Sequence, residues 1–116
     1  MRGTMITIRP DGSTDLLEFA RAPSLEEITK AVGGDFELVP GFDSIIYHGV
    51  VMTCRALCDE HGKIEGRPIN RLATIEWQLA LHRSGHDGLL KDDDLRDWLV
   101  GSVAVLFGDA EFMRAL

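Results

Sequence analysis

The sequence predicts an α+β fold: a single small domain with a mainly antiparallel sheet of about five strands and two main helices packed on it. Three observations support this fold class. Short runs with strand-like alternation fill most of the front half of the 116-residue chain, and two segments have helical spacing and capping signals. A chain of this length is expected to form one domain, and it can bury a core without metal or disulfide bonds.

The expected strands are runs in which apolar and polar residues alternate or, at the end of the chain, an apolar run bounded by glycines. They lie at residues 5–9, 15–20, 35–39, 44–48, 50–58 and 101–108. The turn-forming residues 10–13 between the first two predict a hairpin. On a single strand over residues 50–58, Cys54 and Cys58 would lie about 13 Å apart. That separation excludes a disulfide, so we expect two reduced, buried thiols.

The first helix is expected over residues 24–32. Ser24 and Glu27 have the spacing of a capping box, and Gly33 can take the left-handed backbone angle that ends a helix. A helix this short requires a sheet to pack against. Its inner face would be formed by Leu25, Ile28 and Val32.

The second helix is expected over residues 70–84, after an extended connection that Gly66 and Pro68 impose. Asn70 is a good N-cap, and the stripe expected to face the core is Leu72, Ile75 and Leu79. Trp77 lies off this stripe. Either the helix is buried on two sides or Trp77 faces a partner, which makes Trp77 the candidate interaction surface and a candidate homodimer contact.

The end of the chain is expected to add two short helical pieces. Acids at residues 92–94 precede Leu95, Trp98 and Leu99, which have the spacing of a one- to two-turn helix. The tail at residues 109–116 is expected to form a last helical turn. Its candidate anchors are Phe112 and Leu116.

The charge balance is acidic, with a formal net charge of −7 and an isoelectric point of about 4.9. This argues against a diffuse nucleic-acid or anionic-membrane surface and is compatible with a basic protein partner. The sequence has no apolar run long enough to cross a bilayer, and its first residues lack the apolar core of a signal peptide. A cytoplasmic location is the default expectation.

One candidate ligand site lies where the second helix begins. Arg67, Asn70, Arg71 and Thr74 surround a helix N-terminus, whose free amide groups favour anions. The alternative is structural, with Asn70 as the helix cap and Arg71 as a solvated side chain. We favour the structural interpretation, because asparagine is a common helix cap.

Metal-binding residues occur in two weak patterns. His82 and His86, four residues apart, could bind one ion together with Asp87, although Ser84-Gly85 is expected to break the helix between them. Cys54, Cys58 and His61 lack the second pair of a zinc signature. No phosphate-binding loop, dinucleotide fingerprint or nucleophile elbow is present, and no cofactor is expected.

Three runs of the chain resemble a known family when they are taken in order. They are Val32-Gly33-Gly34-Asp35-Phe36-Glu37-Leu38-Val39, Gly66-Arg67-Pro68-Ile69-Asn70-Arg71-Leu72-Ala73-Thr74, and residues 101–108. Their order and spacing resemble the domain-of-unknown-function family numbered 3846, with Asp59-Glu60 as its acidic strand end. The resemblance covers residues 5–108 and leaves residues 82–94 and the tail at 109–116 without a family pattern. It implies an accessory protein of phages, plasmids or other mobile elements, and it implies no activity.

Three functions remain open on this basis. The first is a non-enzymatic accessory protein that binds a host protein, with an anti-defence or anti-restriction decoy as the specific form. The second is a module that binds or sequesters a small ligand such as a nucleotide. The third is a metal-dependent hydrolase that uses the histidines. The expected partner is a host protein or a second copy of the chain, with no direct nucleic-acid binding.

Overall fold

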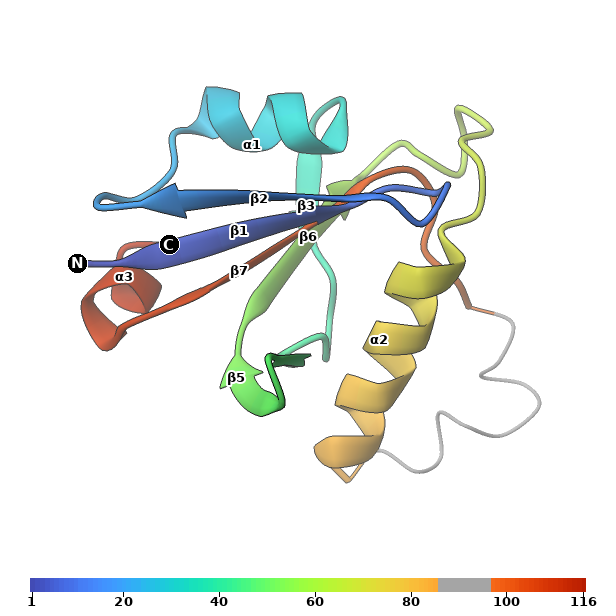
Figure 1. The fold of residues 1–116 in the computed structure, drawn as a ribbon. Coiled ribbons are helices and arrows are strands. Elements are labelled where there is room, and N and C mark those ends of the chain that lie inside the picture. Colours follow the sequence, from blue (N-terminus) through green and yellow to red (C-terminus); the bar gives the residue numbers. More distant parts are fainter. Residues whose placement is uncertain (86–96) are drawn as a thin grey trace.

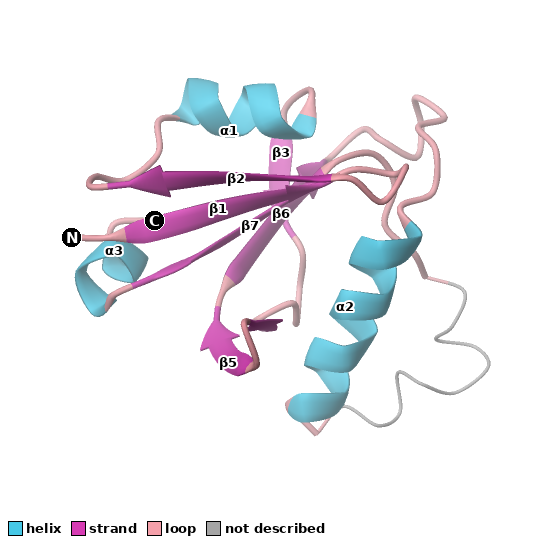
Figure 2. Ribbon diagram, in the orientation of Figure 1, coloured by secondary structure: helices cyan, strands magenta, loops and turns pink. Residues whose placement is uncertain are grey.

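The computed structural model describes residues 1–85 and 97–116 and confirms the α+β fold class (Figures 1 and 2). In this part of the chain, five strands form one sheet and two strands form another. The strands are β1 (Gly3–Ile8), β2 (Thr14–Phe19), β3 (Phe36–Leu38), β4 (Ser44–Tyr47), β5 (Val50–Thr53), β6 (Arg55–Asp59) and β7 (Val103–Gly108). The helices are α1 (Leu25–Val32), α2 (Arg71–Arg83) and α3 (Ala110–Arg114).

The main sheet has the order β2-β1-β7-β6-β3, and its neighbouring strands are antiparallel. β1 and β2 form the predicted hairpin, with Gly3 opposite Phe19 and Ile8 opposite Thr14. The glycine-bounded β7 lies at the centre, between β1 and β6, because its residues are apolar on both faces. This arrangement leaves β2 and β3 as the two edges of the sheet.

The side chains of β7 divide the core into two layers. Val103, Val105 and Phe107 pack with residues of α2 and β4 on one face of the sheet. Ala104 and Leu106 pack with residues of α1 and α3 on the other. Figure 1 shows this arrangement, with α1 on one side of the main sheet and α2 with the β4–β5 hairpin on the other.

The local signals predicted for α1 are confirmed. The Ser24 hydroxyl accepts a hydrogen bond from the Glu27 amide, the Glu27 carboxylate accepts one from the Ser24 amide, and Gly33 ends the helix at φ 87°. Ile28 and Val32 are buried as expected, but Leu25 is exposed. Leu25 is the first residue of the helix and lies beside an open groove, so the prediction that it faces the core was wrong.

α2 begins at its predicted cap but turns a different face to the core. The expected inner stripe of Leu72, Ile75 and Leu79 is exposed, whereas Ala73, Ala80 and Leu81 are buried. Small side chains allow the helix to approach its neighbours closely, so packing selects the alanine face rather than the leucine face. Trp77 is half-buried on the packed side and donates a hydrogen bond to the Pro40 carbonyl at 2.8 Å. A homodimer contact stays a prediction.

The strand expected over residues 50–58 is divided at Cys54. β5 pairs with β4 in the small sheet, and β6 pairs with β3 and β7 in the main sheet. The Cys54 amide donates to the Asp43 carbonyl at 2.9 Å, so the chain leaves the strand geometry there. The single-strand geometry of the two cysteines was therefore wrong. Both are nevertheless free thiols, with Cys54 buried and Cys58 half-buried.

The chain after residue 96 is only partly helical. Trp98 and Leu99 lie in extended chain, not in the expected helix, because the Leu99 carbonyl accepts a hydrogen bond from the Asn70 amide and Val100 pairs with Ile69. The acids at residues 92–94, and Leu95 with them, lie outside the described residues. The tail forms α3 as predicted, with Phe112 fully buried. None of the described helices has the length and apolar character that crossing a membrane requires.

Candidate functional site

The family-like runs of the chain meet at one corner of the sheet, where Arg67 makes three contacts. Its Nη2 donates a hydrogen bond to the Gly33 carbonyl at 2.7 Å and lies 3.3 Å from the Glu65 carboxylate. Its Nε lies 2.6 Å from Oδ2 of Asp59, whose side chain is only 1% exposed. These two atoms are close but not aligned as a hydrogen bond, so electrostatic attraction holds the pair.

Two glycines make room for this ion pair. A Cβ atom on Gly34 would lie 3.1 Å from Asp59 Oδ2, and a Cβ atom on Gly101 would lie 2.9 Å from Arg67 Cδ. Gly101 also has φ 68°, a backbone angle that side-chain-bearing residues rarely adopt. Gly34, in the first family-like run, and Gly101, in the third, therefore leave the space that the Asp59–Arg67 pair occupies.

Asn70 closes the same corner from inside. It is 0% exposed, and its Nδ2 donates to the carbonyls of Ile8 and Gly101, each at 2.8 Å. Its Oδ1 accepts from the Ala73 amide at 3.0 Å, which is the predicted helix cap. We call Asp59, Arg67 and Asn70 the clamp, because they join β1, β6, α1, α2 and the start of β7.

The structure places the four predicted ligand residues in different surroundings. Asn70 and Thr74 are buried, and the Thr74 hydroxyl donates to the Asn70 carbonyl and accepts from the Leu99 amide. Arg67 is partly exposed and Arg71 is exposed. The structural interpretation of Asn70 is confirmed. A ligand role for the four residues stays a prediction, and only the two arginines have access to solvent.

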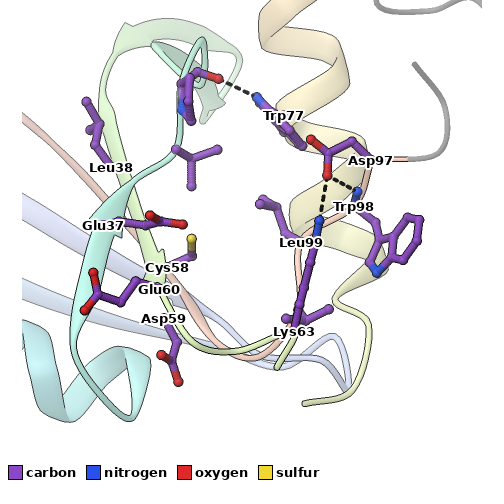
Figure 3. Close-up of a pocket in the computed structure, with 13 residues that line it drawn as sticks. Glu37, Leu38, Cys58, Asp59, Glu60, Lys63, Trp77, Asp97, Trp98 and Leu99 are labelled. Carbon is purple, nitrogen blue, oxygen red and sulfur yellow. Dashed lines mark hydrogen bonds and ion pairs between the residues drawn. The ribbon is translucent and has the colours of Figure 1, made fainter. Parts of the chain in front are cut away.

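Next to the clamp lies a cavity of about 170 Å³ that we call the acidic cleft (Figure 3). Its walls come from β3, the end of β6, the following turn, α2 and residues 97–100. Four acidic residues and one lysine contribute to its lining, and the buried Asp59 carboxylate among them is already paired with Arg67. The five residues are Glu37, Asp59, Glu60, Asp97 and Lys63. Figure 3 shows Glu37 and Cys58 reaching into the cleft from one wall, with Leu99 and Asp97 on the opposite wall.

The contacts of Lys63 show that one wall of the cleft can bind an ammonium group. The Nζ atom of Lys63 lies 2.8 Å from Oδ1 of Asp97 and 5.0 Å from the centre of the Trp98 ring. An ammonium group over an aromatic face and beside a carboxylate is a favourable cation environment. Trp77 also lines the cleft, so both tryptophans of the chain belong to its wall.

The thiol of Cys58 is unsuited to nucleophilic chemistry. Burial, and then the negative charges of Glu37 and Asp59, raise its pKa to about 11. Burial raises the pKa of Cys54 to about 12. Because the thiolate is the reactive form, both cysteines are inert near neutral pH. Asp97 adds to this rise in the pKa of Cys58, and Lys63 opposes it.

Asp35, Glu60 and His61 are the described residues that come together as three possible metal ligands, with their ligand atoms within 4.8 Å of one another. All three are exposed. The Glu60 amide donates to the Asp35 carbonyl, and the His61 amide donates to Asp59 Oδ1, so the backbone that carries them is held in place. A divalent cation could use these oxygen and nitrogen atoms.

Among the described residues, Cys54 and Cys58 do not come together with His61 as possible metal ligands. His61 has the carboxylates of Asp35 and Glu60 beside it, and its Nε2 lies 3.1 Å from Glu60 Oε1. His82 is exposed near the end of α2. His86 and Asp87 lie outside the described residues, so their proposed site stays a prediction.

Sequence reasoning missed the acidic cleft. Its walls are far apart in the chain, with Glu37 and Asp97 separated by sixty positions. One signal was present: residues 35–39 and 50–58 were both expected to be strands, and the acids Asp59 and Glu60 follow the second. If the two strands are paired as in the structure, with Phe36 opposite Asp59, the acids of residues 35–39 lie beside Asp59 and Glu60.

Comparison with known proteins gives one result. A family model described as Domain of unknown function (DUF3846) matches residues 1–113. The match includes the clamp. It also includes most of the tail at residues 109–116, which lay outside the resemblance over residues 5–108. No curated protein and no solved structure matches the chain.

Proposed function

The chain belongs to the DUF3846 family, and on this premise we propose that it acts by binding a partner protein whose basic side chains enter the acidic cleft. The observation that carries the proposal is the composition of the cleft: four acidic residues and one lysine line it, and of the acids only Asp59 is buried and paired with an arginine. Clefts lined by one sign of charge concentrate groups of the opposite sign. The net charge of −7 would attract a basic partner from a distance.

The two tryptophans support recognition of a side chain rather than of a bare ion. Aromatic residues and arginine are enriched at the centres of protein interfaces. Trp98 already lies under the Lys63 ammonium, and a lysine or arginine of a partner could take the same position after displacing it. Because the side chains of both Lys63 and Asp97 are more than half exposed, separating this ion pair costs about 1 kcal/mol or less.

A mobile-element setting would make the partner a host protein. The family-like runs imply such a setting, and a host defence or restriction protein is the specific candidate. Nucleic-acid-binding proteins present basic grooves, and an acidic protein can occupy such a groove in place of the nucleic acid. This proposal predicts competition with nucleic acid at the partner's surface and no nucleic-acid binding by the chain itself.

The test is a titration with peptides of known charge, followed by tryptophan fluorescence and calorimetry. A lysine- and arginine-rich peptide should bind and a glutamate-rich peptide should not, with affinity falling steeply as salt rises above about 0.1 M. The double variant Glu37→Gln/Asp97→Asn should weaken binding. Its matched control, Glu18→Gln/Glu26→Gln, removes two exposed acids elsewhere and should bind almost as the wild type does. Equal loss in both double variants would reject the cleft as the site.

A second candidate function is supported by a separate cavity of about 600 Å³ between the β1–β2 hairpin and α1. Its lining includes three cations, Arg9, Lys30 and Arg67, and two acids, Asp15 and Glu27. The excess of cations suits a small anionic ligand such as a nucleotide. Thermal-shift measurements with nucleotides and with inorganic phosphate test this candidate. Stabilisation that the Lys30→Gln variant removes would support it, and no shift with any of these anions would reject it.

A further inference from the structure

β3 is an edge strand whose outer side is open for pairing within the described part of the chain. The Glu60 amide donates to the Asp35 carbonyl, and the Val39 amide donates to the Ala56 carbonyl. In an antiparallel pair, successive residues direct their backbone groups to opposite sides. The backbone groups of Phe36 and Leu38 therefore point away from β6, toward the edge.

Two different surfaces flank this edge, and Glu37 and Leu38 contribute to the lining of both. Glu37 faces the acidic cleft on one face of the sheet (Figure 3). On the other face, a groove of about 370 Å³ is lined mainly by apolar side chains. They include Leu25, Ile28, Phe36, Leu38, Leu57 and Leu116. Leu25 and Leu38 are exposed, so the groove has apolar walls that meet water.

We propose that β3 accepts an extended segment of a partner protein in which basic and large apolar residues alternate. Successive side chains of a strand point to opposite faces, so such a segment would place its basic side chains over the acidic cleft and its apolar side chains in the groove. The paired region from Asp35 to Val39 is long enough for about five partner residues, or roughly 17 Å of strand.

Charge complementarity selects this occupant over a second copy of the chain. A copy of β3 would bring its own Glu37 toward the acidic side of the edge, where like charges repel. A segment with lysine or arginine at alternate positions instead meets Glu37, Glu60 and Asp97. The inference rests on the proposed function, since it specifies how the basic side chains reach the cleft.

The experiment uses the wild-type chain and four lysine–leucine peptides of about seven residues. The parent peptide alternates the two residues, and an isomer of equal composition groups them in two blocks. Two further peptides carry the alternating sequence with N-methyl groups either on all lysine amides or on all leucine amides. One set of amides must face β3 and the other must face solvent. One methylated peptide should therefore lose about tenfold or more in affinity while the other binds like the parent.

Variants of the chain separate the two surfaces. Asp97→Asn should weaken every lysine-containing peptide by about two- to fivefold, because Asp97 lines the cleft and not the groove. Leu25→Ala should weaken the alternating peptide and leave the block isomer unaffected, because Leu25 lines the groove and not the cleft and only the alternating peptide fills the groove. Circular dichroism checks that both variants fold.

The outcomes distinguish the two proposals. If both methylated peptides or the block isomer bind as tightly as the parent, strand addition is wrong and binding of basic side chains stands. If no lysine-containing peptide binds at low salt, the proposed function fails and the inference fails with it. Loss of binding for one methylated peptide only, together with weak binding of the block isomer, supports both.

Discussion

The clamp and the acidic cleft share Asp59 and lie side by side, yet their polar groups are used differently. In the clamp, Asn70 is fully buried and its amide group contacts three backbone groups. In the cleft, Glu37 and Asp97 are exposed and their charges face a common space. Polar groups that are satisfied inside the fold stabilise it, whereas polar groups that converge on an open space are available to a partner.

The largest expected effect comes from the centre of the clamp. Asn70→Ala removes the cap of α2 and leaves the Ile8 and Gly101 carbonyls without their donor. Buried groups that lose a partner cost about 1–3 kcal/mol each, and a lost cap costs about 1 kcal/mol, so we expect a loss of about 3–5 kcal/mol in the free energy of unfolding. Urea denaturation measures it.

Asn70→Ser provides the matched control for this prediction. Serine keeps a side-chain oxygen that can cap the helix, but it lacks the amide donors. It should therefore recover about 1 kcal/mol relative to alanine. A loss below about 1 kcal/mol for Asn70→Ala would show that the clamp does not stabilise the fold.

A smaller effect is expected where a glycine makes room for the clamp. Gly101→Ala should cost about 2 kcal/mol, because alanine is strained at φ 68° and its Cβ would lie 2.9 Å from Arg67 Cδ. Gly66→Ala is the matched control, since Gly66 has φ 70° and nothing within 4 Å of the added Cβ. Thermal unfolding of both variants isolates the contact with Arg67. Equal destabilisation would mean that backbone strain alone sets the cost.

The capping box of α1 tests whether a polar group that is not buried can still stabilise the fold through its hydrogen bonds. The Glu27 side chain is 30% exposed, and the hydrogen bond from Arg21 and then that from the Ser24 amide lower its pKa from 4.5 to about 2. A lowered folded-state pKa means that the ionised carboxylate stabilises the fold above its unfolded-state pKa. This contribution should be lost as the pH falls from 4.5 to about 2.

Unfolding measured across this pH range gives the test. The advantage of the wild type over Glu27→Gln should shrink as the pH falls, because glutamine keeps the capping geometry without the charge. Glu26→Gln, which changes an exposed acid one position earlier, is the control and should not reproduce the change. An advantage that is constant across the range would exclude Glu27 as the source of acid sensitivity.

Most local structure of this chain could be predicted from the sequence. The hairpin, the capping box at Ser24, the cap at Asn70 and the central strand β7 depend on neighbouring residues or on continuous apolar runs, and all are confirmed. The packed face of α2 could not be predicted, because apolar residues occur on several sides of the helix. Periodicity selected the leucines, whereas close packing selected Ala73 and Ala80.

The candidate site likewise has one part that could be predicted from the sequence and one part that could not. Asn70 was recognisable as a cap because capping is local, but its bonds to Ile8 and Gly101 depend on the folded chain. The cleft requires β3, β6 and residues 97–100 to meet, and the single strand expected over residues 50–58 concealed the true start of β6 at Arg55. Long-range pairing, rather than residue type, therefore determines which acids converge.

The smallest expected effect on stability comes from the cleft, and this prediction separates the role of the cleft from that of the clamp. Glu37→Gln/Asp97→Asn should change the free energy of unfolding by less than about 1 kcal/mol, since exposed charges contribute little and asparagine can still accept from the Trp98 amide. The same variant should lower the pKa of Cys58, which both carboxylates raise. Alkylation of Cys58, followed by mass spectrometry against pH, should therefore begin at lower pH than in the wild type. A stable variant with a more reactive thiol is the outcome expected of groups that set the field of a binding site. Marked destabilisation with an unchanged thiol would instead place Glu37 and Asp97 with the clamp.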